Sequence, residues 1–356
     1  MRAIVFDGTS AALRDDVEVR DPGDDEVLVR VKAAGLCHSD VSVINGTIPF
    51  PPPVVLGHEA AGVVESVGSA VTGLAAGDHV VLSTLGNCGS CPACDRGKPT
   101  HCRATMGRLS RPFLVGGQKA FQFANVSAFA ERTVVKGRQA VKIDPAVPFA
   151  SASLVGCGVI TGVGAVVNRA RVAPGSTVAV IGVGGIGLNV VQGARLAGAG
   201  RIIAIDANSA KTDLAVQFGA TDTIVVDAGL DVVEAVKGLT GNGVDYAFEC
   251  VGVPALIEQA IDMLDWGGTC VILGVPKLGT SASFVVNTLY NDKTIMGCRY
   301  GSARPQADFP MLVDWYRTGR LLLDELVTET FPLADFDTAL AALHEGRVAR
   351  AVLTLD

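Results

Sequence analysis

Three glycines in the run VAVIGVGGIGLNVVQGA constrain the fold of this 356-residue chain more than any other feature. Gly182, Gly184 and Gly187 form a G-x-G-x-x-G pattern that follows a predicted strand and opens a predicted helix. The first glycine permits a tight turn, the second lets backbone approach a pyrophosphate, and the third lets the helix pack closely on the sheet. A phosphate would then meet backbone N–H groups at the helix start, near Gly185. The pattern predicts a dinucleotide site.

An acidic residue ends the next predicted strand. The run RIIAID ends at Asp206, nineteen residues after Gly187. A carboxylate at this distance accepts hydrogen bonds from an adenosine ribose. The alternative is a structural glycine turn with an incidental acid, which the ordered set of strand, glycines, helix, strand and acid disfavours. The Asp206 carboxylate would repel the 2′-phosphate of NADP, and no Arg follows it immediately, so the sequence predicts NAD.

The pattern of apolar residues along the chain changes near residue 176. Residues 1 to about 155 carry short apolar stretches broken by Gly, Pro or Asp, which predicts a mostly β unit. After residue 176, near-continuous apolar runs alternate with helix-length segments, the pattern of buried parallel strands in an α/β protein. Those runs are TVAVIG, RIIAID, TDTIVV, VDYAFEC, TCVILGV and TIMGC. In the more polar tail, DFPMLVDWYRTGRLL predicts an amphipathic helix and RAVLTLD a final strand. The sequence predicts two domains, with the tail assignable to either.

Charge and hydropathy exclude several classes of partner. The net charge is −7 and no Lys/Arg run occurs, which disfavours nucleic-acid binding. The apolar stretch 178–200 is interrupted by Asn189, Gln192 and Arg195, so it is a poor membrane span. The N-terminal residues lack the apolar core of a signal peptide. We therefore expect a cytoplasmic protein without membrane partners, whose thiols stay reduced.

Residues 88–102, CGSCPACDRGKPTHC, hold four cysteines. A disulfide framework is disfavoured by reducing surroundings and by the odd total of nine cysteines. Bacterial iron–sulfur spacing ends in C-x3-C-P, which differs from the x7 gap and missing Pro here. Four close thiolates can wrap one tetrahedral zinc and leave no open position. The cluster therefore predicts a structural zinc site, made by Cys88, Cys91, Cys94 and Cys102.

Chemistry must then lie elsewhere, and three separate segments offer metal ligands. The segment LCHSD gives Cys37, LGHEAAGVV gives His58 and VGCGV gives Cys157. Two cysteines and one histidine can form an open zinc site with room for water or substrate. Each residue alone also has an ordinary structural interpretation, Cys157 as a small buried hydrophobe and His58 as a satisfied loop histidine. Spacing alone does not group them.

The sequence resembles the zinc-dependent medium-chain alcohol dehydrogenases. The stretch GHEAAGVVESVGSAV carries that family's G-H-E-x2-G-x5-G-x2-V signature, at Gly57, His58, Glu59, Gly62, Gly68 and Val71. The four-cysteine lobe, the GVGGIG turn, Asp206 and the ILGVP segment (272–276) follow in family order, so the resemblance covers essentially the whole chain. It implies a GroES-like β catalytic domain at 1–158 and 300–356, with the zinc lobe at 88–102. It also implies a Rossmann NAD-binding domain with a doubly wound parallel sheet at 159–299.

The resemblance also implies roles for single residues. Cys37, His58 and Cys157 would hold a catalytic zinc, and Glu59 is an acid that can approach the metal. Asp40 would orient His58, and Ser39 would pass the substrate proton onward. The implied cofactors are NAD and two zinc ions, one catalytic and one structural. The implied cofactor contacts besides the glycines and Asp206 are His38, Lys211, Val275 and Arg350, and the implied pocket residues are Ile48, Thr84 and Arg299.

Three of these positions, and also Ser42, depart from the family pattern or leave alternatives open. His38 stands where members often carry an Arg against the pyrophosphate, and Ser42 stands where many carry a His that ends the proton relay. Arg350 could instead be a plain surface residue. Arg299 replaces an apolar or small pocket residue, and it could face solvent, pair with an acid or meet a polar substrate tail.

The sequence predicts an NAD-dependent zinc alcohol dehydrogenase that interconverts primary alcohols and aldehydes. Thr84 is small where many members carry an aromatic ring, which favours medium-chain or aromatic alcohols over ethanol. The main alternative is a thiol-dependent formaldehyde dehydrogenase, because residues 297–316 are similar to actinobacterial members of that type. A non-catalytic NAD-binding homologue is a remote alternative, disfavoured by the complete ligand set. The family implies a homodimer or homotetramer joined through the edge of the Rossmann sheet.

Overall fold

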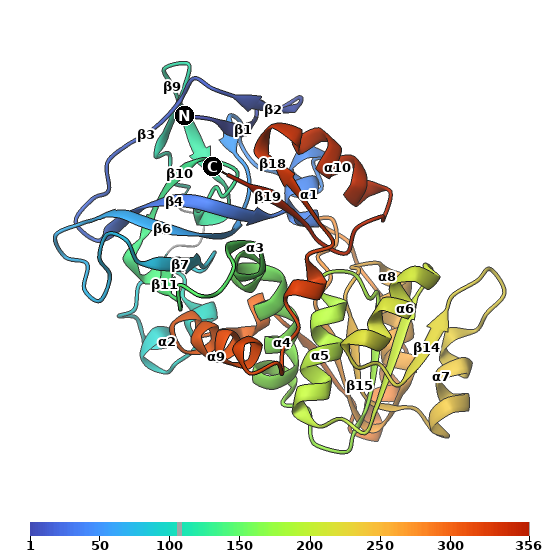
Figure 1. Cartoon of the computed structure of the whole chain (residues 1–356). Helices are drawn as coiled ribbons and strands as arrows, with labels where there is room; N and C mark the ends of the chain where they lie inside the picture. Colours follow the sequence, from blue (N-terminus) through green and yellow to red (C-terminus); the bar gives the residue numbers. More distant parts are fainter. Residues whose placement is uncertain (105–108, 356) are drawn as a thin grey trace. The chain divides into compact units, whose positions relative to one another are not determined.

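A computed structural model of the chain describes residues 1–104 and 109–355. It divides into two compact units, shown in Figure 1. Unit 1 comprises Met1–Gly158 and Arg304–Asp356, and unit 2 comprises Val159–Ala303. The second division lies four residues beyond the expected one at residue 300. The 3₁₀ turn Tyr300–Ser302 explains the difference, because a Cβ on Gly301 would lie 2.0 Å from the Ile160 carbonyl oxygen. Residues 300–303 thus pack with unit 2.

Unit 1 is built on two sheets. The seven-stranded sheet has the order β11-β7-β6-β4-β19-β18, with β10 pairing to β4. Its strands are β11 (Ala140–Lys142), β7 (His79–Leu82), β6 (Glu59–Val67), β4 (Glu26–Gly35), β19 (Ala351–Thr354), β18 (Glu329–Pro332) and β10 (Arg132–Lys136). The six-stranded sheet has the order β2-β1-β5-β9-β8-β3. Its strands are β2 (Ala11–Arg14), β1 (Ala3–Phe6), β5 (Val54–Val55), β9 (Gln118–Gln122), β8 (Phe113–Val115) and β3 (Val17–Val19).

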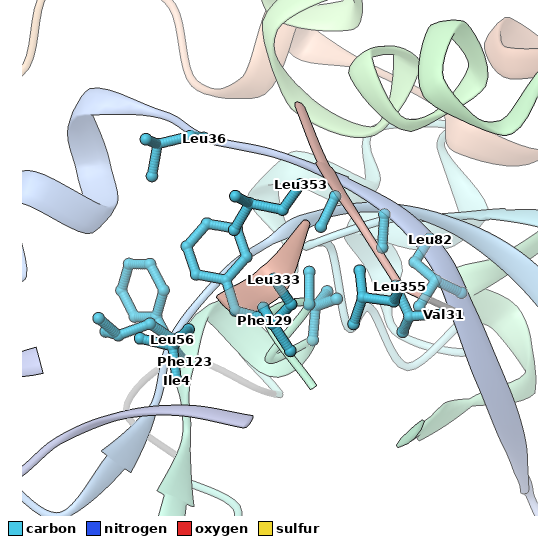
Figure 2. Close-up of a cluster of buried hydrophobic side chains, with 14 of the residues drawn as sticks. Ile4, Val31, Leu36, Leu56, Leu82, Phe123, Phe129, Leu333, Leu353 and Leu355 are labelled. Carbon is cyan, nitrogen blue, oxygen red and sulfur yellow. The ribbon is translucent and has the colours of Figure 1, made fainter. Parts of the chain in front are cut away.

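The core of unit 1 follows from strand alternation. In β4, Val27, Val29 and Val31 are fully buried while Arg30 points outward and pairs with Glu65, as expected for a strand that buries one face. The buried side chains join a cluster drawn in Figure 2, which also contains Leu36, Leu56 and Phe129. This cluster anchors the segments that carry candidate metal ligands.

Five helices belong to the described part of unit 1. They are α1 (His38–Ile44), α2 (Pro92–Asp95), α3 (Phe149–Leu154), α9 (Pro305–Arg317) and α10 (Phe336–His344). Helix α9 confirms the amphipathic helix predicted in the tail, and β19 confirms the final strand. Short 3₁₀ turns are Pro99–His101, Phe123–Asn125, Gly137–Gln139, Asp324–Leu326 and Leu333–Asp335.

Unit 2 contains one six-stranded sheet in which every strand pair is parallel, in the order β14-β13-β12-β15-β16-β17. Counted within the unit, this is the order 3-2-1-4-5-6 of a doubly wound dinucleotide-binding sheet. The predicted fold class is therefore confirmed. The strands are β14 (Asp222–Val225), β13 (Arg201–Asp206), β12 (Thr177–Ile181), β15 (Val244–Glu249), β16 (Leu264–Ile272) and β17 (Thr294–Gly297).

Helices of unit 2 cover this sheet in two groups. Helices α5 and α6 contact β12–β14 and each other, while α7 and α8 contact β15 and each other. The helices are α4 (Ile160–Gly164), α5 (Gly187–Ala197), α6 (Ser209–Phe218), α7 (Val232–Thr240) and α8 (Pro254–Asp262), and a 3₁₀ turn spans Val286–Asn291.

Helix α3 continues through a π turn (Val155–Val159), α4 and a second π segment (Ala165–Ala170). In the described part of the chain, this stretch, Phe149–Ala170, is the one helix long and apolar enough to cross a membrane by length and composition. Its most apolar window is 83% buried inside the protein. The burial is that of a core helix.

Candidate active site

Cys37 caps the start of helix α1. The preceding Leu36 is fully buried, which fixes the chain where β4 turns into the helix. The backbone N–H of Cys37 donates to Asp40 Oδ2 at 3.2 Å. Asp40 itself is fully buried. The short helix thus presents a buried thiol and, three residues later, a buried carboxylate.

His58 immediately precedes β6 and contacts the same carboxylate. His58 Nδ1 is 3.3 Å from Asp40 Oδ1, which also accepts a hydrogen bond from the Gly57 backbone N–H at 3.0 Å. Gly57 has φ +88°, and a Cβ there would lie 2.4 Å from the backbone nitrogen of Phe129, so only glycine fits. This contact is the one that the predicted role of Asp40 requires, which is to orient the ring so that Nε2 could hold a metal, and that role stays a prediction.

Cys157 reaches the other two ligands from the π turn Val155–Val159. Glycines on both sides allow the approach. A Cβ on Gly156 would lie 2.6 Å from the Leu82 carbonyl oxygen, and one on Gly158 would lie 1.6 Å from Arg350 Nη2. Single π turns are frequent at functional sites. Here the turn lets Cys157 lie beside strand β7 and the buried Arg350.

The structure brings Cys37, His58, Glu59 and Cys157 together, with one potential ligand atom from each, all within 4.8 Å of one another. A hydrogen bond from Cys157 lowers the pKa of Cys37 well below its ordinary value, and the same bond, with burial, raises the pKa of Cys157. Burial opposes a charge on His58, but Asp40 outweighs it and raises the pKa of His58. Two sulfurs and an imidazole suit zinc, and metal binding would release their protons.

Glu59 is a fully buried acid with an unusual environment. Burial raises the pKa of its carboxyl to about 7, although the positive charge of Arg350 opposes this. Arg350 Nη1 lies 3.2 Å from Glu59 Oε1. Among the described residues, however, neither Glu59 oxygen has a hydrogen-bond partner of good geometry. Orphaned oxygens beside two thiols and an imidazole are what a nearby cation would satisfy, so the group fits a metal.

Arg350 is 4% exposed, so the alternative that it is a plain surface residue is wrong. Its Nε and Nη2 atoms lack hydrogen-bond partners within residues 1–104 and 109–355. Contact with a cofactor pyrophosphate stays a prediction for these two donors. The ion pair between Arg350 and Glu59 could not be predicted from the sequence. Glu59 is the first residue of β6 and Arg350 precedes β19, so the two are far apart along the chain.

The other predicted residues of unit 1 differ in accessibility. Ser39 is half-buried, with Oγ 3.9 Å from Cys37 Sγ, whereas His38 is exposed. Ile48 and Thr84 are half-buried. Ser42 is also half-buried, and its backbone carbonyl oxygen accepts a hydrogen bond from the Ile48 backbone N–H at 2.8 Å. The structure thus places the Ser39 hydroxyl beside the ligand group.

Sequence reasoning missed Phe123, whose ring packs edge-on against His58 with centroids 5.5 Å apart. It precedes two residues with left-handed backbone, Ala124 and Asn125. Neither is glycine, so no sequence pattern marked the turn.

The four-cysteine lobe forms a second potential metal group in unit 1. One sulfur from each of Cys88, Cys91, Cys94 and Cys102 lies within 4.8 Å of the others. The Cys88 backbone N–H points to Cys102 Sγ at 3.4 Å, and Asn87 Nδ2 to Cys94 Sγ at 3.6 Å. A backbone hydrogen bond from Ser90 is the main cause that lowers the pKa of Cys88, to about 6. Such N–H donors stabilise thiolates, so this group fits a structural zinc.

The glycine turn of unit 2 fits a dinucleotide. Gly182 has φ +83°, and a Cβ on Gly187 would lie 2.0 Å from the Gly182 carbonyl oxygen, so the helix packs closely only without a side chain. Gly184, in contrast, has no described atom beyond its chain neighbours within 4 Å of the point where a Cβ would lie. That open space is where a phosphate could approach backbone. The turn at Gly182 and the close packing at Gly187 have the steric causes that we expected, and phosphate binding at Gly184 stays a prediction.

Asp206 ends β13 beside this turn. Its Oδ2 accepts from the Val183 backbone N–H at 3.1 Å, and its Oδ1 from that of Asn208 at 3.0 Å. Lys211 is half-buried in the first turn of α6, and Val275, after β16, is 65% exposed. Arg299, the third predicted pocket residue, is exposed on unit 2. Their contacts with ligands stay predictions.

Comparison with known proteins now assigns the family. Two family models match, a "Zinc-binding dehydrogenase" over residues 185–318 and an "Alcohol dehydrogenase GroES-like domain" over residues 23–145. The S-(hydroxymethyl)glutathione dehydrogenase of Synechocystis sp. is 40% identical over 349 residues, which cover 95% of each chain. The chain belongs to the zinc-dependent medium-chain alcohol dehydrogenase family.

Other relatives of this dehydrogenase differ in the substrate that their names give. The class-3 alcohol dehydrogenase of Pisum sativum is 38% identical over 366 residues, covering 99% of this chain and 97% of the relative. The crystal structure of benzyl alcohol dehydrogenase from Acinetobacter calcoaceticus matches with a TM-score of 0.94 and 35% identity, covering 100% of this chain and 99% of that one. The dehydrogenase is therefore an enzyme of small alcohols or aldehydes. With the two ligand groups, its family confirms zinc and NAD as cofactors.

Proposed function

We propose that this dehydrogenase oxidises the hydroxymethyl adduct that formaldehyde forms with a low-molecular-weight thiol, using NAD. The observation that carries the proposal is the buried group of Cys37, His58 and Cys157 in a chain 40% identical to an S-(hydroxymethyl)glutathione dehydrogenase. This was the alternative at the level of sequence. It now ranks above the oxidation of simple primary alcohols.

Zinc held by Cys37, His58 and Cys157 would supply Lewis acidity toward the substrate hydroxyl, and NAD would supply the hydride acceptor. Ser39 Oγ, beside Cys37, accepts the hydroxyl proton and passes it on. Asp40 holds the imidazole of His58 in one orientation. In the overall reaction, a C–H bond of the hydroxymethyl carbon breaks with both electrons and the O–H bond loses its proton. The new C=O bond makes the product an S-formyl thioester.

Simple primary alcohols form the second candidate substrate class. A benzyl alcohol dehydrogenase shares the fold at a TM-score of 0.94. Thr84 is also smaller than the aromatic ring that many family members carry at this position. Because each buried CH₂ contributes about 0.8 kcal/mol, a roomier apolar pocket would favour benzyl alcohol or hexanol over ethanol.

An assay of NADH formation separates the two classes. Formaldehyde is supplied with and without glutathione or other low-molecular-weight thiols, beside ethanol, hexanol and benzyl alcohol. We expect formaldehyde oxidation to require a thiol and to exceed benzyl alcohol oxidation in kcat/KM. Thiol-independent activity with benzyl alcohol as the best substrate would contradict the proposal in favour of the second class. No NADH from any substrate would contradict both.

A further inference from the structure

Gln139 is a buried side chain that the proposed reaction does not use. It is 2% exposed and ends the 3₁₀ turn Gly137–Gln139 between β10 and β11. Its Nε2 donates to the carbonyl oxygens of Ser83 at 2.8 Å and Asn125 at 3.0 Å, and its Oε1 accepts from the Lys136 backbone N–H at 3.1 Å. A carboxamide has two N–H donors, and both are used here. Gln139 therefore ties together two segments that are far apart in the sequence.

The first segment, Ser83–Thr84, lies beside the metal ligands. Strand β7 ends at Leu82, which pairs with Ala60 of the antiparallel β6. The ladder ends there, and because the strands are antiparallel, Ser83 and Thr84 continue the chain past the end of β6 that His58 precedes. The Leu82 carbonyl oxygen would lie 2.6 Å from a Cβ on Gly156, the neighbour of Cys157. This segment is one wall beside the ligand group.

The second segment, Phe123–Ser127, also borders His58. The edge-on ring of Phe123 lies 5.5 Å from that of His58. Three residues that are not glycine, Ala124, Asn125 and Ser127, have φ between 48° and 60°. Left-handed backbone is costly for such residues and persists where surrounding contacts impose it. This wall is therefore held in place by its neighbours.

A second tie joins the same two walls. Asn125 Nδ2 donates to the Thr84 carbonyl oxygen at 3.1 Å. We propose that Gln139, together with Asn125, is a positioning residue that holds these walls at a fixed separation beside His58 and thereby sets which substrates fit. The proposal rests on the proposed function, because it assigns the walls to a substrate of the zinc and NAD reaction.

The decisive variant is Gln139→Met, which keeps the length of the side chain and removes both donors. The carbonyls of Ser83 and Asn125 lose their partner, so both walls loosen. We expect amide hydrogen exchange at 83–85 and 123–127 to become faster together, with zinc content unchanged. We also expect the kcat/KM ratio between the best substrate and ethanol to fall by about tenfold, since small displacements of positioning groups cost large factors in rate.

Gln122→Met is the matched control. Gln122 is 5% exposed and its Nε2 donates to the carbonyl oxygens of Val126 at 3.1 Å and Val134 at 2.8 Å, so it holds the second wall to β10. We expect a comparable loss of thermal stability, but wild-type exchange at 83–85 and a substrate ratio within about twofold of the wild type. Asn125→Gly, which keeps left-handed backbone easy, should be non-additive with Gln139→Met.

Two results would overturn the proposal. One is wild-type exchange at 83–85 in Gln139→Met, which would show that Gln139 does not tie the walls. The other is an equal shift of the substrate ratio in Gln122→Met, which would reduce Gln139 to a contributor to stability. Failure of the proposed function has a different signature, because an inactive wild type would leave the exchange experiment intact.

Discussion

Buried polar atoms show most clearly what single residues do in this dehydrogenase. Asp40 is fully buried and shares its two oxygens among Cys37, Gly57 and His58. Glu59 is equally buried, yet its oxygens have no such donors in the described part of the chain. We therefore expect the first acid to support the ligands and the second, which among the described residues is paired only with Arg350 at 3.2 Å, to respond to a metal. Burial alone would not distinguish them.

The hydroxyl of Ser39 should carry the substrate proton. We expect Ser39→Ala to retain zinc and NAD but to lose turnover by about 10²–10⁴-fold, the usual contribution of positioned proton transfer. The measurement is kcat across pH, beside metal analysis. Ser42→Ala, on the same helix, is the comparison and should lose much less. Near-normal turnover of Ser39→Ala at every pH would remove Ser39 from the relay.

Glu249 predicts a pH dependence of stability within unit 2. It ends β15, its Oε1 accepts from the N–H groups of Val251 and Gly252, and Oε2 is buried with no partner in the described structure. Burial raises the pKa of this carboxyl above its ordinary 4.5, although the hydrogen bond from Gly252 opposes the shift. A carboxyl whose pKa is raised in the folded state does not reduce the stability of the fold below its ordinary pKa, because it is protonated in both states. It costs stability as pH rises from that value to the folded pKa.

Glu249→Gln removes this titration, because the amide is neutral at every pH. The Tm of the variant relative to wild type should therefore increase as pH rises above about 4.5, the ordinary pKa of the carboxyl. The exposed Asp213→Asn on α6 is the control for loss of one charge. A Tm difference that stays constant over this range would show that Glu249 does not titrate differently on folding.

At the scale of elements, the first half of the four-cysteine lobe has little packing of its own. Helix α2 has only four residues and none of them is buried. Cys91→Ser should therefore reduce zinc from two ions per chain, the number of ligand groups, to one. We expect Tm to fall by about 5–10 °C, because loss of a metal is among the large single-residue effects.

Elemental analysis and thermal unfolding check this expectation, with Cys298→Ser as the control outside both ligand groups. The control should keep both zinc ions. Two zinc ions retained in Cys91→Ser, or iron in the wild type, would contradict a structural zinc site in the lobe.

Strands and turns that are specified by their own residues were predictable from the sequence. The run EVLVRVKAAG forms β4 over Glu26–Gly35, and each predicted apolar run after residue 176 forms a strand of the parallel sheet. Alternation or continuous burial specifies such strands without distant contacts. The glycine turn was equally predictable from the sequence, because a residue with a side chain would not fit at these positions.

Elements that depend on distant contacts were not predictable. The π turn at Val155–Val159 is shaped by Leu82 and Arg350. The left-handed segment Phe123–Ser127 is held by Gln139 and by other buried polar groups. In both cases the cause lies elsewhere in the chain, and only the folded structure brings it next to the effect. The grouping of Cys37, His58 and Cys157 likewise needed the family resemblance, because their spacing carries no pattern.

At the scale of the whole molecule, the candidate metal site and the candidate dinucleotide site belong to different units. Unit 1 holds both metal groups and Ser39, and unit 2 holds the glycine turn and Asp206. A variant of one unit can therefore be checked against the ligand of the other. Cys157→Ser should lose catalysis and one zinc ion while NAD binding at the glycine turn persists.

The most direct test follows the hydrogen that leaves the substrate. Dideuterated formaldehyde with a thiol, or dideuterated benzyl alcohol, is incubated with NAD, and the reduced cofactor is analysed by mass spectrometry. Direct hydride transfer predicts one deuterium on each molecule of NADH from the wild type, and no reduced cofactor from Cys157→Ser, which still binds NAD. Unlabelled NADH from the wild type, or undiminished label transfer by Cys157→Ser, would contradict the account.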